Sequence, residues 1–246
     1  IKKDGKLTGV LIDNAMQPVF KILPKMGQKE SIKALMDAQK ACFNFGLTTV
    51  NEAGISRKII ELIDSLQKEN TLDMRIYAMV SNTPADVDYY LEKGIYKTPR
   101  LNVRSVKVYG DGALGSRGAA LRAPYADRAN HFGAMVTPID SIESVAKKLA
   151  ASEFQMNTHA IGDSANHVVL TTYDEVLQGQ DDRRWKVEHA QVISPEDFKY
   201  FSKNILPSVQ PTHATSDMPW AQDRLGAERM KGAYAYKQLL QESGVI

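Results

Sequence analysis

The sequence predicts an α/β fold, an incomplete TIM-type (β/α)8 barrel with about six of its eight strands. Short β-type runs alternate with stretches of helical spacing along the chain, and this alternation is typical of parallel βαβ units. Three of the runs also end in residues that can bind a metal ion, namely Lys107, His159 and His189. Because such a barrel places its chemistry at the C-terminal ends of its strands, we expect these three residues to converge.

The first half of the chain shows the alternation clearly. Residues 31–45 have apolar side chains at helical spacing, with Ser31 as the predicted N-cap and Gly46 as the end. Residues 47–54 are predicted to form a strand. A helix is expected around residues 59–66, followed by a strand at 72–80, a weaker helix after Pro84 and a strand at 103–110.

The second half continues the pattern. Helices are predicted around residues 142–149 and 169–177, and strands at 154–159, 185–190 and 206–213. Ser194 and Pro195 with two following acids form a typical helix start. Residues 234–243 are expected to form a last helix, with Gly244 just past its end.

The organisation predicts one domain over residues 1–246, interpreted as the middle of a larger protein. Nothing along the chain reads as a repeat or a linker. Residues 2–16 look like a connecting segment, and the chain stops where another strand is expected. We therefore expect a barrel that lacks its first and last strands.

Composition limits the classes of partner. The 246 residues are 43% hydrophobic and carry a net charge of +2, without a long basic run, so nucleic acid is not an expected partner. No apolar run approaches the ~20 residues of a membrane span. The one cysteine, Cys42, lies in an apolar stripe, which favours a core position. The compartment stays open, with the cytoplasm favoured over the periplasm.

Alternation along the strands predicts where the candidate ligands point. In residues 103–109, Lys107 lies on the face opposite Val106 and Val108, and so is expected to face the polar interior. His159 is expected to do the same, whereas the direction of His189 is less certain. A buried lysine must pair with a carboxylate, lose its proton or be modified. A salt bridge to an interior acid is therefore the alternative explanation for Lys107.

A glycine-rich loop follows the Lys107 strand. Gly110, Gly112 and Gly115 match the spacing of a dinucleotide-binding fingerprint, but that motif needs a helix opening inside it, and none is predicted here. We interpret the loop as passing close to a bound ligand, with Asp111 and Arg117 facing it. A solvent-exposed turn and a nicotinamide- or flavin-dependent enzyme are the alternatives.

Seven motifs, in order, resemble the amidohydrolase superfamily, specifically its amidohydrolase-3 or YtcJ-like branch, which includes N-substituted formamide deformylases. They are TGVLIDNA, TTVNEAG, VKVYGDGALGSRGAAL, THAIGDSAN, VEHAQ, SVQPTHATSDMPW and RMKGAYAYKQLL. Together they span almost the whole chain, and seven ordered matches are much more specific than any one of them.

The resemblance implies a set of site residues. Lys107 matches the carboxylated lysine that bridges metal ions in the family, and His159 and His189 match two ligand histidines. These three are therefore the expected catalytic and metal-binding residues, for one or two divalent ions in the intact protein, with zinc favoured. Asp111, Arg117 and His213 match positions that line the substrate pocket.

The resemblance also implies an activity, with two departures. The expected function is hydrolysis of carbon–nitrogen, non-peptide amide-type bonds of a small-molecule substrate by a metal-activated water. The family's His-x-His pair and catalytic Asp are absent from these residues, as is its accessory β-sandwich, so we expect the 246 residues alone to be inactive. A non-catalytic binding barrel is the alternative. Open strand edges predict association, for example as a homo-oligomer.

Overall fold

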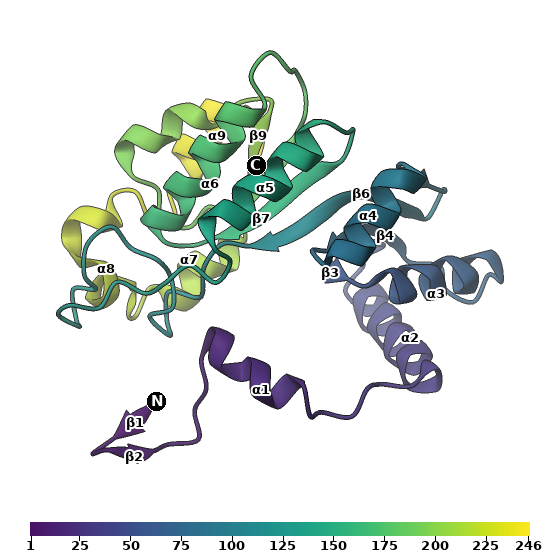
Figure 1. Ribbon diagram of the computed structural model, residues 1–246, viewed down its shortest axis with the longest axis horizontal. Helices are drawn as coiled ribbons and strands as arrows, with labels where there is room; N and C mark the ends of the chain where they lie inside the picture. Colours follow the sequence, from purple (N-terminus) through teal and green to yellow (C-terminus); the bar gives the residue numbers. More distant parts are fainter. The chain divides into compact units, whose positions relative to one another are not determined.

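The computed structural model describes residues 1–246, which form two compact units (Figure 1). The larger unit contains residues 1–23, 109–148 and 158–246. The smaller unit contains residues 24–108 and 149–157. The chain therefore changes unit four times, after residues 23, 108, 148 and 157.

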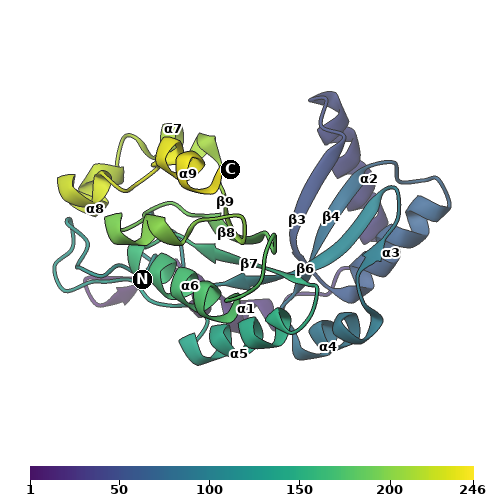
Figure 2. The same cartoon turned by 90° about the horizontal axis from the view of Figure 1, so that it is seen from above.

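The smaller unit contains a layer of parallel strands, and helices connect these strands along the chain. Strands β3, β4 and β6 are parallel neighbours in that order, and β5 adds to β6 in the antiparallel direction. Helices α3 and α4 contact β4, as Figure 2 shows. The elements are α2 (Gln28–Asn44), β3 (Thr49–Ile55), α3 (Arg57–Lys68), β4 (Arg75–Ser81), α4 (Pro84–Lys93), β5 (Tyr96–Lys97) and β6 (Leu101–Tyr109).

The larger unit continues the strand order with β7, β8 and β9. Helix α6 contacts β8 and β9, and α9 contacts β9 (Figure 1). The elements are β1 (Lys2–Lys3), β2 (Lys6–Leu7), η1 (Asp13–Met16), α1 (Gln17–Phe20), α5 (Ile139–Ala150), β7 (Gln155–Ala160), α6 (Asp163–Val176), β8 (Trp185–His189), η2 (Pro195–Tyr200), β9 (Ile205–Ser208), α7 (Pro211–Asp217), α8 (Ala221–Met230) and α9 (Tyr236–Ser243).

The predicted fold class is confirmed. The main strands follow the order β3-β4-β6-β7-β8-β9, so each parallel connection carries a helix or a long loop. No pairing joins β9 back to β3, and the strand order does not close. This is the topology of an incomplete TIM-type barrel, with six strands in the path.

Three element boundaries differ from the prediction. The strand expected over residues 206–213 ends at Ser208, because Pro211 starts helix α7 as its first residue. The start signal at Ser194 gives only the short 3-10 helix η2. Ser31 is not a cap but lies inside α2, where its hydroxyl donates to the carbonyl of Gly27.

Aromatic and aliphatic side chains fill the interior of both units. In the larger unit, the fully buried rings of Tyr173 on α6 and Trp185 on β8 meet edge to face, with centroids 4.8 Å apart. In the smaller unit, Ile60 and Ile63 of α3 are buried at the face that contacts β4. None of the helices is long and apolar enough to cross a membrane.

Candidate active site at the ends of β7 and β8

Strand β7 carries His159 on its polar face, as the alternation predicted. The hydroxyl of Tyr77 donates to Gln155, and Asn157 donates to the same hydroxyl. Thr158, one residue on, forms a hydrogen bond of 2.6 Å with Tyr173 of α6 and so faces the helix layer. His159 therefore shares the face of Gln155 and Asn157, because successive strand residues alternate in direction.

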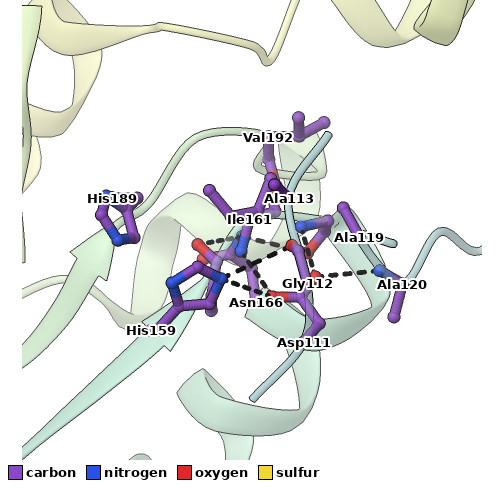
Figure 3. A network of polar contacts seen from close by, with 12 residues as sticks. Asp111, Gly112, Ala113, Ala119, Ala120, His159, Ile161, Asn166, His189 and Val192 are labelled. Carbon is purple, nitrogen blue, oxygen red and sulfur yellow. Dashed lines mark hydrogen bonds and ion pairs between the residues drawn. The ribbon is translucent and has the colours of Figure 1, made fainter. Parts of the chain in front are cut away.

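His189 is oriented by its backbone and not by alternation. It is the last residue of β8, and its φ of 76° lies in the left-handed region, as does the φ of 42° at Ala190. Two consecutive non-glycine residues in this region are strained, and such strain gathers at functional sites. The turn brings the His189 ring against that of His159, with centroids 4.7 Å apart and planes at 73° (Figure 3).

Each of these two imidazoles has one ring nitrogen near an acceptor oxygen. His189 Nδ1 lies 2.5 Å from Oε1 of Gln210, so this nitrogen carries the proton and Nε2 carries the lone pair. His159 Nε2 lies 3.5 Å from the Gly112 carbonyl oxygen and 3.5 Å from Asp111 Oδ1. A ligand histidine almost always donates its other N–H to an oxygen in this way. The donor set therefore fits a metal ion.

A third histidine extends the pair. His213 lies on α7, and its ring stacks on that of His189 at 5.3 Å with planes 21° apart. Tyr236 donates to the backbone carbonyl of Gln210, next to the start of α7. The structure thus brings three of the predicted site residues, His159, His189 and His213, into one row. The prediction that His213 contacts substrate stays a prediction.

Asp111 is buried beneath His159 and is not at the surface. Its carboxylate accepts hydrogen bonds of 2.9–3.0 Å from the backbone N–H groups of Ala120, Ile161 and Gly162 (Figure 3). Burial raises the pKa of Asp111 to about 7, against the opposing effect of these three donors. The structure therefore brings Asp111 to the site through His159, while its predicted contact with substrate remains a prediction.

Arg117 is held in an ion pair. Its Nε and Nη2 atoms donate to the two carboxylate oxygens of Asp127, at 3.0 and 2.7 Å. Arg224 donates to the same carboxylate. The two arginines hold the pKa of Asp127 below its usual value, Arg117 through the largest contribution. The structure does not group Arg117 with the histidines, and its predicted role at the substrate is a proposal.

Lys107 lies on β6 in the smaller unit, in register with Ser81 of β4. It is only 3% exposed, and burial at this level requires compensation of the charge on its amine. No group of three or more His, Cys, Asp or Glu side chains is placed to hold a metal ion. The predicted ligand set is of another composition, since one of its three members is a lysine.

The glycine-rich loop packs tightly and has no helix between residues 110 and 138. Gly110 donates its N–H to the carbonyl of His159, and a Cβ there would come within 2.7 Å of that oxygen. Leu114 and Ala119 are buried in a hydrophobic cluster with residues of α8 and of the β8 loop. The loop is therefore neither an exposed turn nor a dinucleotide fingerprint, which needs a helix at this point.

Two polar residues of the site were not predicted. Gln210 orients His189, and Asn166 of α6 donates to the backbone carbonyls that follow His159 and His189. Asn166 lies on the same stripe of α6 as the buried Val169 and Tyr173. A polar residue on such a stripe was the available signal, because a buried amide must find hydrogen-bond partners.

Comparison with known proteins shows the family. A model of the amidohydrolase family matches residues 1–245, so the chain belongs to that family. "Protein LONG AFTER FAR-RED 3" of Arabidopsis thaliana is 31% identical over 98% of the chain. "Putative amidohydrolase YtcJ" of Bacillus subtilis is 30% identical over 96% of it. The chain spans 44% and 45%, respectively, of these two curated relatives.

Two crystal structures have the same fold. An uncharacterized metal-dependent hydrolase from Pyrococcus furiosus superposes with a TM-score of 0.81 at 27% identity, covering 94% of this chain and 48% of the other. A second such hydrolase, from Pyrococcus horikoshii, gives a TM-score of 0.80 at 24% identity, covering 94% and 46%. The family match and the 30% identity to "Putative amidohydrolase YtcJ" confirm the predicted resemblance to the YtcJ-like branch.

Proposed function

We propose that this chain forms part of a metal-dependent hydrolase that cleaves carbon–nitrogen bonds of the amide type in small molecules. The observation that carries the proposal is the pair of imidazoles at the ends of β7 and β8, each with one nitrogen near an acceptor oxygen. Its membership of the amidohydrolase family and its likeness to metal-dependent hydrolases support the same activity.

We propose Lys107, His159 and His189 as the ligands of one divalent cation, with zinc favoured and a carboxylated Lys107 as the anionic member. A divalent cation bound there would lower the pKa of a water molecule and polarise the carbonyl of the substrate. His189, fixed by Gln210 through Nδ1, presents Nε2 to the cation. His213, stacked on His189, is proposed to contact the substrate together with Asp111 and Arg117.

The first test is metal content, measured by elemental analysis of the purified protein beside two variants. We expect bound zinc or another transition metal in the wild type and a loss of most of it in His159→Ala, because one of three ligands is removed. The matched control is His167→Ala. His167 lies on α6 and pairs with Asp197, outside the row of three histidines.

Each outcome separates two readings of the site. Metal that falls in His159→Ala but not in His167→Ala supports the hydrolase. A wild type that takes up no metal when zinc and bicarbonate are supplied argues for a barrel that only binds ligands. Turnover of N-formyl or N-acyl amines by residues 1–246 would contradict the expectation that these residues alone are inactive.

A further inference from the structure

Asn166 is a buried hub of hydrogen bonds beside the proposed site. It lies on the first turn of α6 and is fully buried. Its side-chain amide nitrogen lies 3.0–3.2 Å from four backbone carbonyls, those of Ala160, Ile161, Gly162 and Val192. The first three belong to the turn directly after His159, and Val192 lies three residues after His189. One amide group thus ties together the segments that follow both histidines.

Asp111 holds the same turn from its other side. Its carboxylate accepts from the N–H groups of Ile161 and Gly162, while Asn166 donates to the carbonyls of the same two residues. In Figure 3 Asp111, Ile161 and Asn166 lie close together, with the His159 ring beside them. The packing leaves no slack, since a Cβ on Gly162 would come within 1.9 Å of the Ala120 carbonyl oxygen.

We propose that Asp111 and Asn166 are positioning residues that together set the spacing of the His159 and His189 rings for a divalent cation. The inference rests on the proposed function. His189 and Ala190 hold a strained backbone, which persists only where the surroundings over-determine it. The bond from Asn166 to Val192, just beyond this strained pair, supplies such a constraint, and Asp111 also faces His159 Nε2 directly.

Asp111 and Asn166 are suited to positioning the turn because one side chain accepts hydrogen bonds and the other donates them. A carboxylate only accepts and an amide nitrogen only donates, so each can serve one set of backbone groups. Asn166→Asp keeps the shape of the side chain but directs an oxygen at four carbonyl oxygens. Asp111→Asn directs an amide at backbone N–H groups. Both changes therefore disturb the turn without altering the volume of the core.

The experiment measures zinc affinity by competition with a coloured chelator. Bicarbonate is present in the buffer so that Lys107 can be carboxylated. We expect the affinity to fall roughly 10- to 100-fold in Asn166→Asp and Asp111→Asn, the range seen when groups that orient metal ligands are lost. The matched control is Asn204→Asp, because Asn204 also donates its amide to a backbone carbonyl, that of Gln180, and lies beside the start of β8, at the opposite end of that strand from His189. Its zinc affinity should stay within a few-fold of the wild type.

A purely structural role predicts a different result, namely lower stability with unchanged zinc affinity in the folded variants. That outcome would overturn the proposal. A second readout needs no variant: zinc should slow hydrogen exchange at the amides of Ile161 and Gly162, because coupling between the turn and the cation is reciprocal. Unchanged exchange at these two amides in protein saturated with zinc would also contradict the proposal, and this measurement decides the matter should both variants fail to fold.

The design separates this inference from the proposed function. Should the wild type bind no zinc, the proposed function fails, and imidazole NMR of the metal-free protein tests the positioning residues. Cross-peaks between the rings of His159 and His189, 4.7 Å apart between centroids, should weaken in Asn166→Asp and in Asp111→Asn and persist in Asn204→Asp. Identical cross-peaks in all four proteins would leave Asp111 and Asn166 without a positioning role.

Discussion

His189 shows how a single residue can override the pattern of its strand. By alternation it belongs with Trp185 and Val187, which are buried in the core. Its positive φ turns the chain at this residue, so its ring meets His159 instead. The strain costs about 1–3 kcal/mol, which surrounding hydrogen bonds must offset. A feature with this cost at a strand end is typical of a functional position.

The ion pairs of Asp127 predict how the free energy of unfolding depends on pH. The arginines hold its pKa in the folded protein below the ordinary value of 3.8, so its contribution to stability is complete above 3.8. The contribution is lost as the pH falls through the lower, folded-state pKa. Asp127→Asn should therefore lower the free energy of unfolding by about 1 kcal/mol at pH 7, in keeping with partly exposed pairs. The difference from the wild type should shrink below pH 3.8.

Urea unfolding at pH 7 and at two values below 3.8 measures this difference. Asp182→Asn is a suitable control, because Asp182 pairs with the neighbouring, exposed Arg184. It should change the stability less than Asp127→Asn does. A penalty for Asp127→Asn that grows as the pH falls would contradict the assignment of the charged form to the folded state.

Local signals decide where helix α4 of the smaller unit begins. Helix α4 has Thr83 as its N-cap, whose side chain accepts from the backbone N–H of Asp86, and Pro84 as its first residue. These features are independent of the rest of the fold, since they satisfy orphan N–H groups of the first turn. The weak helix predicted after Pro84 is therefore present over Pro84–Lys93.

The N-cap of α4 is expected to stabilise this helix and thereby the folded protein. Thr83→Ala should lower the free energy of unfolding by about 1 kcal/mol, because the first turn loses the side-chain acceptor. Thr83→Ser keeps a hydroxyl and should lie close to the wild type. Chemical denaturation followed by circular dichroism measures both. Equal stability of the alanine and serine variants would show that this hydrogen bond contributes nothing.

The two compact units share strands across their boundary. Strand β7 contributes residues 155–157 to the smaller unit and 158–160 to the larger one. Strand β6 ends at Tyr109, one residue beyond the boundary at residue 108. Because a strand loses its ladder when either half unpairs, unfolding of one unit should disturb the other. The whole chain is therefore expected to unfold cooperatively.

Intrinsic fluorescence tests this cooperativity, since both tryptophans, Trp185 and Trp220, belong to the larger unit. Fluorescence thus reports on the larger unit, whereas far-ultraviolet circular dichroism reports on the helices of both. We expect the two urea transitions to coincide, as required for all-or-none unfolding. Two separate midpoints would contradict the expectation and show that the units unfold independently.

The sequence by itself determined the alternation of strands and helices, the family and the direction of His159. The alternation and the direction of His159 follow from short-range physics, namely period-2 and period-3.6 burial and caps at helix ends, whereas the family follows from the seven ordered motifs. Even the start of α7 at Pro211, where the prediction continued a strand, belongs to this class, because proline at the first helical position was a readable signal.

Only the tertiary structure decided how the site is assembled. Gln210 reaches His189 across 21 residues, and Asp111 reaches Gly162 across 51. Such partners cannot be read from local periodicity, because a buried polar group takes whichever donor or acceptor the fold brings near. The turn at His189 has the same cause. The positive φ of His189 is held by surrounding contacts, and no residue type in VEHAQ predicts a positive φ at this position.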